Sequence, residues 1–127
     1  MLSMFHEILL DHFQNPRNVG ELAPPALQVE VSNPACGDIL RLSVRLESGV
    51  VLEARYKSRG CTASVAAGSA LTEWLIGKDL ARLRLLTAET VAGELGGLPP
   101  ESRHAAVLAA DSVREILRVV TAGGAGG

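Results

Sequence analysis

The chain has 127 residues and a formal net charge of −2, which suit a single domain and do not favour a nucleic-acid-binding surface. Its hydrophobic fraction of 47% is typical of a globular protein. No run of about 18 apolar residues is present, so we expect no membrane span. The first residues lack a basic segment followed by an apolar one, so we expect no signal peptide and a cytoplasmic protein.

The first third of the chain predicts a helix and a connector. Apolar residues recur at helical spacing from Met4 to Phe13, and Pro16 ends this pattern. Within it, His6 is expected to be a solvated helix residue. A connector with Pro24 and Pro25 then leads into the strands.

Three segments then alternate apolar and polar residues, which predicts strands with one buried face. The link Glu47-Ser48-Gly49 predicts a hairpin between the second and third. The side chains expected on the buried face are Leu27, Val29 and Val31 of the first strand, Leu40, Leu42, Val44 and Leu46 of the second, and Val50, Leu52, Ala54 and Tyr56 of the third.

From Thr62 onward the apolar spacing becomes helical. We expect an alanine-rich helix ending before Gly77, short helices over 80–86 and from Thr87 to about Glu94, and a long helix over 101–120. The predicted fold class is therefore α+β, a three-stranded antiparallel sheet with helices packed on one face, including an N-terminal helix and a long C-terminal helix. We expect residues 1–121 to form one domain and 122–127 to form a flexible glycine-rich tail.

Four residues could bind a metal through side chains that are far apart in the sequence. Cys36 and Asp38 flank Gly37 between two strands, Cys61 follows Gly60 just before a helix, and His104 lies in the first turn of the last helix. A helix N-terminus stabilises a thiolate and favours the neutral imidazole that binds metals. Two sulfurs, a nitrogen and an oxygen suit zinc or an iron–sulfur centre.

Spacing alone leaves other interpretations open, because the chain has no C-x-x-C pair. Either cysteine could be a buried small hydrophobe, and the two could form a disulfide, although a cytoplasmic chain disfavours it. His104 could be a helix cap or a surface residue.

Several segments in a fixed order carry a resemblance that covers the chain from Ile8 to about Val120. They are Leu10-Asp11-His12-Phe13-Gln14-Asn15-Pro16-Arg17-Asn18-Val19-Gly20, Asn33-Pro34-Ala35-Cys36-Gly37-Asp38, Gly60-Cys61-Thr62-Ala63-Ser64, Leu71-Thr72-Glu73-Trp74, and Leu98-Pro99-Pro100 with His104. With them the chain resembles the IscU/SufU/NifU-type iron–sulfur cluster assembly scaffolds. It lacks the insertion of SufU-type members, so it is more similar to the IscU and NifU N-terminal type.

The resemblance implies a scaffold or carrier rather than an enzyme. Such proteins receive sulfur as a persulfide from a cysteine desulfurase, take up ferrous iron, assemble a transient [2Fe–2S] cluster and pass it to iron–sulfur acceptor proteins. The ligands it implies here are Cys36, Asp38, Cys61 and His104. We expect a monomer or a weak homo-oligomer that binds neither nucleic acid nor membranes.

Two positions depart from the family pattern. Where the family has a cysteine directly after the histidine, this chain has Ala105, which can neither ligate a metal nor carry a persulfide. Cys36, with Cys61 second, would then accept the sulfur, and a cluster with fewer thiolates would be more labile. A zinc-bound sulfur acceptor and a degenerate paralogue are the alternatives. Glu101-Ser102 follows Leu98-Pro99-Pro100 in place of Val-Lys, so we do not expect an Hsp70-type chaperone to dock in the usual mode.

Overall fold

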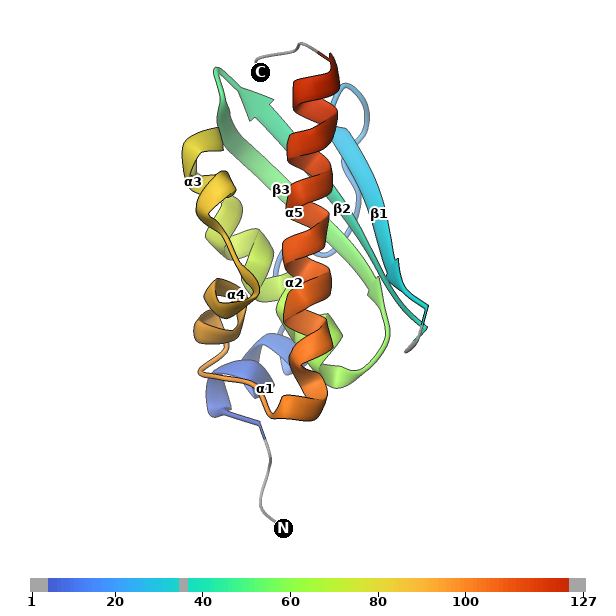
Figure 1. Ribbon diagram of the computed structural model, residues 1–127, viewed down its shortest axis with the longest axis vertical. Coiled ribbons are helices and arrows are strands. Elements are labelled where there is room, and N and C mark those ends of the chain that lie inside the picture. Colours follow the sequence, from blue (N-terminus) through green and yellow to red (C-terminus); the bar gives the residue numbers. More distant parts are fainter. Residues whose placement is uncertain (1–4, 35–36, 124–127) are drawn as a thin grey trace.

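The computed structural model describes residues 5–34 and 37–123 of the chain. Figure 1 shows the predicted α+β architecture, in which a three-stranded antiparallel sheet carries helices on one face. The elements in chain order are α1 (Glu7–Gln14), β1 (Leu27–Asn33), β2 (Asp38–Glu47), β3 (Val50–Arg59), α2 (Thr62–Leu75), α3 (Leu80–Leu85), α4 (Ala88–Glu94), the 3₁₀ helix η1 (Pro100–Ser102) and α5 (Arg103–Gly123).

The sheet has the order β1-β2-β3, and a bulge in its hairpin changes one predicted face. Arg45 pairs with Glu53 but Leu46 pairs with Val51, so Leu52 is the extra residue on β3. Because a bulge shifts the alternation by one residue, Val51 is fully buried and Leu52 is 40% exposed. The prediction that Val50 and Leu52 face the core is therefore wrong, whereas Ala54 and Tyr56 are buried as expected.

Helices α2 and α5 cover one face of the sheet, α2 mainly over β3 and α5 mainly over β1 (Figure 1). Small residues on α2 bring it close to the sheet. The ring of Tyr56 packs directly on Gly68, and its hydroxyl donates a hydrogen bond to the carbonyl of Val65 at 2.8 Å. Burial raises the pKa of Tyr56 to about 12, so this hydroxyl stays protonated and continues to donate.

Two helix boundaries differ from the prediction. Helix α1 begins at Glu7, because Nδ1 of His6 accepts a hydrogen bond from the backbone N–H of Ile8 at 3.0 Å. His6 is exposed, as expected, but it is the N-cap and not a residue within the helix. Helix α5 begins after η1 and continues to Gly123, beyond the expected end at Val120. Residues 124–127 of the predicted tail lie outside the described residues.

The exit of α1 is bound to the middle of α2 by a buried polar contact. Nδ1 of His12 lies 2.7 Å from the hydroxyl of Ser69, which also accepts the backbone N–H of Arg17 at 2.9 Å. Burial, followed by the charge of Arg17, lowers the pKa of His12, so its ring is neutral in the folded protein. These contacts fix the chain direction after α1.

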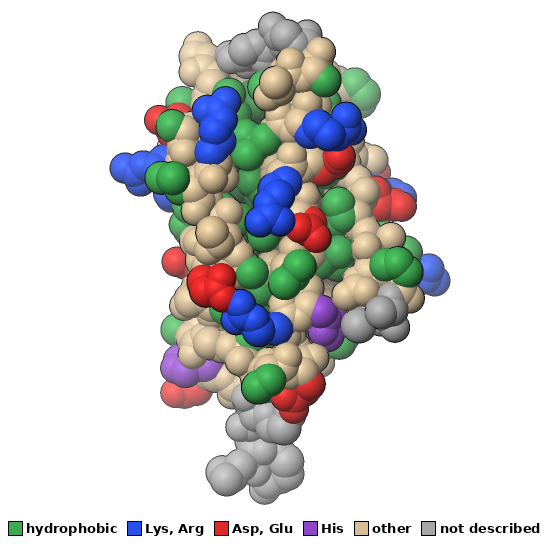
Figure 2. Space-filling view, viewed as in Figure 1, with side chains coloured by type: hydrophobic (Ala, Val, Ile, Leu, Met, Phe, Trp, Pro, Cys, Tyr) green, Lys and Arg blue, Asp and Glu red, His purple; other side chains and the backbone are tan. Residues whose placement is uncertain are grey.

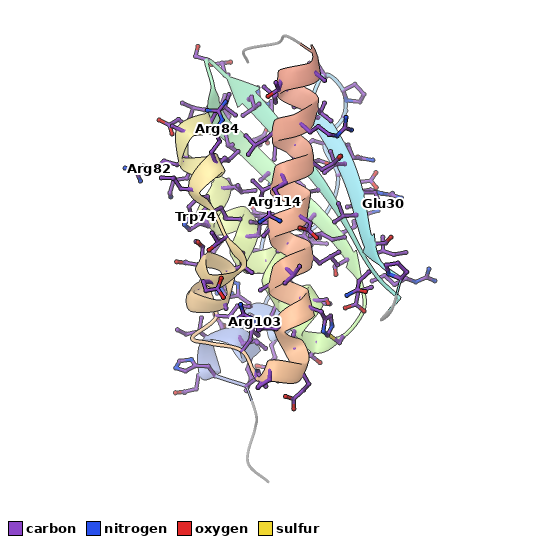
Figure 3. All side chains as sticks on the ribbon, viewed as in Figure 1. Glu30, Trp74, Arg82, Arg84, Arg103 and Arg114 are labelled. Carbon is purple, nitrogen blue, oxygen red and sulfur yellow. The ribbon has the colours of Figure 1, made fainter. Side chains whose placement is uncertain are left out.

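The outward face of α5 carries alternating charges, as the space-filling view shows (Figure 2). Arg114 pairs with Asp111 at 2.8 Å, and Arg103 in the first turn pairs with Glu89 of α4 (Figure 3). Basic side chains on this face are therefore neutralised locally by neighbouring carboxylates. Within the described residues, no helix combines the length and the apolar character that a membrane span requires.

Candidate metal centre

Three candidate ligands within the described residues, Asp38, Cys61 and His104, lie together at one end of the sheet. Strand β2 begins there, β3 ends there and leads into α2, and η1 leads there into α5 (Figure 1). Two helix N-termini therefore face the same place, and their unpaired N–H groups and dipoles favour anionic ligands.

Asp38 is the first residue of β2 and pairs across the sheet with Asn33. The residue is buried, with only 4% of its surface exposed. A carboxylate buried to this degree requires charged or hydrogen-bonding partners. The structure provides them at one oxygen, Oδ2, which lies 2.5 Å from the hydroxyl of Ser64 and 3.1 Å from Nε2 of His104.

Cys61 is the N-cap of α2, and its carbonyl accepts the backbone N–H of Ser64 at 3.0 Å. Its side chain makes no capping hydrogen bond, so the sulfur is available to other partners. The thiol is free and exposed, which excludes the buried-hydrophobe interpretation for Cys61. A free, accessible sulfur at a helix N-terminus is the arrangement expected of a metal-binding or sulfur-accepting thiolate.

His104 is the second residue of α5, and about a quarter of its side chain (23%) is exposed. Its Nε2 lies 3.6 Å from Sγ of Cys61, in addition to the 3.1 Å contact with Asp38. The ring therefore points into the site and is not only a helix cap.

The three side chains bring one sulfur, one oxygen and one nitrogen together. Sγ of Cys61, a carboxylate oxygen of Asp38 and a ring nitrogen of His104 all lie within 4.8 Å of one another. Atoms spaced in this way can bind one ion after small side-chain rotations, because metal–ligand bonds of about 2.0–2.3 Å bring ligand atoms to such separations. This mixed donor set fits zinc or iron.

Gly60 leaves room for the buried carboxylate. A Cβ atom at this position would lie 2.6 Å from both Cγ and Oδ1 of Asp38. Contacts this short do not occur, so only glycine allows the backbone before Cys61 to pass so close to Asp38.

Two of the sequence predictions at this site need separate comment. Cys36, the predicted fourth ligand, lies outside the described residues. Ala105 directly follows His104 on α5 and is 2% exposed, so the position that differs from the family pattern is buried beside a candidate ligand.

Ser64 is the functional residue that sequence reasoning missed. Its hydroxyl contacts Asp38 at 2.5 Å and Sγ of Cys61 at 3.4 Å, yet the sequence analysis gave it no role. The available signal was its position three residues after Cys61 on a helix that begins there, since side chains at i and i+3 share a face.

Comparison with known proteins shows which family this chain is related to. The family model described as the NifU-like N terminal domain matches residues 4–119. The protein named iron-sulfur cluster assembly scaffold protein IscU in Azotobacter vinelandii is 36% identical over 118 residues, covering 90% of this chain and 91% of that protein. The protein of the same name in Haemophilus influenzae is 36% identical over 114 residues, covering 87% of this chain and 90% of that protein.

A solved structure shows the same fold. The crystal structure of a NifU-like protein (N-terminal) from Brucella abortus matches with a TM-score of 0.63 and 23% sequence identity, covering 90% of this chain and 80% of that chain. The sequence match to the family model and the shared fold agree, and this chain belongs to the NifU-like N-terminal domain family.

Proposed function

We propose that this protein is a non-enzymatic scaffold or carrier on which an iron–sulfur cluster is assembled. Asp38, Cys61 and His104 are the proposed ligands within the described residues, and Cys36 is the proposed fourth. The names of the relatives in Azotobacter vinelandii and Haemophilus influenzae, both called cluster assembly scaffolds, support this role.

The observation that carries the proposal is the meeting of the three donor atoms within 4.8 Å. They come from residues 38, 61 and 104, so the fold and not local sequence brings them together. The site is also accessible, since Cys61 is exposed and His104 is partly exposed. An assembly site must admit iron and sulfur and later release the product, which a closed structural metal site does not do.

Sulfur would arrive as the persulfide of a cysteine desulfurase. A thiolate of this chain, from Cys36 first and Cys61 second, would attack the outer sulfur of that persulfide. The sulfur–sulfur bond of the donor would break, its cysteine would leave as a thiolate, and the persulfide would now be on this chain. With ferrous iron, this sulfur would become the sulfide of a [2Fe–2S] cluster after reduction by electrons from a separate donor.

Anaerobic reconstitution tests the proposal. The protein is incubated with a cysteine desulfurase, cysteine, a thiol reductant and ferrous iron, and visible absorption is recorded. We expect a thiolate-to-iron charge-transfer spectrum that Cys61→Ser removes and that Arg114→Ala, on the exposed face of α5, leaves intact. Absence of such a spectrum from the unsubstituted protein would refute the scaffold role.

A zinc-bound sulfur acceptor is the second candidate, because cysteine sulfur, histidine nitrogen and carboxylate oxygen are the atoms through which proteins bind zinc. Zinc would hold the cysteines as thiolates until sulfur arrives. Metal analysis of protein purified without added metal, combined with trapping of the persulfide on Cys36, separates the two. Stoichiometric zinc with sulfur transfer and no cluster would favour the second candidate.

A further inference from the structure

The Ser64 hydroxyl makes a short hydrogen bond to the buried carboxylate of Asp38. It donates to Oδ2 of Asp38 at 2.5 Å, and its residue is 4% exposed. The serine is held rigidly, because its backbone N–H bonds to the carbonyl of Cys61 at 3.0 Å within the first turn of α2. Charge-assisted hydrogen bonds of this length are strong and directional.

This hydroxyl bond joins two elements of the site. A serine in the first turn of a helix often bonds to backbone groups of that turn. Here the hydroxyl instead donates its hydrogen bond to the carboxylate of Asp38 on β2. The same oxygen lies 3.4 Å from Sγ of Cys61. Ser64 therefore contacts two of the three candidate ligands.

The bond also determines which way the carboxylate faces. Oδ2 accepts the hydrogen bond from Ser64, and it lies 3.1 Å from Nε2 of His104 and 3.9 Å from Sγ of Cys61. Without the hydroxyl, the carboxylate could rotate about χ2, because terminal carboxylate torsions are broad and weakly restrained. Oδ2 would then no longer be held toward the other two donors.

We infer that Ser64 is a positioning residue that holds Asp38 toward Cys61 and His104, and thereby sets the metal affinity of the site. This inference rests on the proposed metal-binding role of the site. Hydrogen-bond partners of ligating side chains typically change metal affinity by about 10–100-fold. The contribution of Ser64 to metal affinity should be larger in this chain, because Ala105 offers no thiolate that could replace Asp38 as a ligand if its carboxylate turned away.

The test compares Ser64→Ala with Ser64→Thr, which keeps a hydroxyl, and with Ser112→Ala. Ser112 is a suitable control, since it is a fully buried helical serine whose hydroxyl bonds only to the carbonyl of Ala109 among the contacts of the described residues. Cobalt(II) is titrated anaerobically into each protein, with its thiolate charge-transfer band as the readout. Crystal structures of the metal-free proteins give the orientation of Asp38.

We expect Ser64→Ala to bind cobalt about 10–100-fold more weakly and to show Asp38 rotated away from His104. Ser64→Thr and Ser112→Ala are expected to retain the affinity and the orientation. Unchanged cobalt affinity in Ser64→Ala, or a loss that Ser112→Ala shares, would overturn the inference. If the unsubstituted protein binds no cobalt, the metal-binding proposal fails by itself. The metal-free structures then decide on Ser64: a rotated Asp38 supports the positioning role, and an unmoved one refutes it.

Discussion

Replacing Gly60 with alanine tests the packing that supports the site. The new methyl carbon would lie 2.6 Å from Cγ of Asp38, whereas non-bonded carbons prefer about 3.5–4.0 Å. The carboxylate must therefore shift by about 1 Å. Because the Ser64 oxygen already lies 2.5 Å from Oδ2, a shift of this size should break the contacts that Asp38 makes with Ser64 and His104.

The expected size follows from those contacts. One hydrogen bond to a buried charged group contributes about 1.5–3 kcal/mol, so the loss of two such contacts in Gly60→Ala should lower the free energy of unfolding by about 3 kcal/mol or more. Because Asp38 is itself a proposed ligand, cobalt affinity should fall by about 10-fold or more. Urea unfolding and anaerobic cobalt titration measure the two effects on the same preparation.

Gly77→Ala is the matched control. Gly77 also has a positive φ, +90°, but a Cβ there would meet nothing within 4 Å. Its substitution should cost about 1–2 kcal/mol of backbone strain and leave cobalt binding unchanged. If Gly60→Ala unfolds like Gly77→Ala and binds cobalt like the unsubstituted protein, the reasoning about Asp38 is refuted.

Three further outcomes are expected. Gly68→Ala should destabilise the protein by up to about 2 kcal/mol, since its Cβ would lie 2.3 Å from the Tyr56 ring and an overpacking cost of about 1–3 kcal/mol exceeds the helix-propensity gain of about 1 kcal/mol; an unchanged or raised melting temperature would contradict this. Because folding lowers the pKa of His12, the unfolded chain takes up a proton at a higher pH than the folded protein does, so the free energy of unfolding falls as the pH drops below the ordinary histidine pKa of 6.5. Urea unfolding at a series of pH values should therefore show a weaker dependence of stability on pH for His12→Asn. An equal slope for both proteins would exclude that role for His12. Ala105→Cys should give a reconstituted cluster that survives several times longer in air, and an unchanged decay of its visible absorption would show that the alanine causes no deficit.

Local sequence patterns predicted most of the fold. Alternation located the strands, and the capping box of Thr87 with Thr90 confirmed the predicted start of α4. Periodicity could not predict the bulge at Leu52, because a bulge depends on the register between two strands. The role of His6 was missed for another reason, because histidine is not a typical N-cap residue.

The candidate site shows a different limit. Spacing alone could not bring Asp38, Cys61 and His104 together, because their separation along the chain says nothing about distance in space. Their glycine-flanked and helix-start positions made them candidates, the resemblance implied that they form one site, and the fold places the three side chains together. Ser64 remained unassigned because serine is common in the first turn of helices, and only the structure shows that its hydroxyl reaches Asp38 on another element.

A crystal structure of the protein loaded anaerobically with ferrous iron would show whether these three side chains bind one ion. We expect an ion bonded at about 2.0–2.4 Å to Sγ of Cys61, a carboxylate oxygen of Asp38 and Nε2 of His104. An ion bound elsewhere, or held by only one of the three, would contradict it.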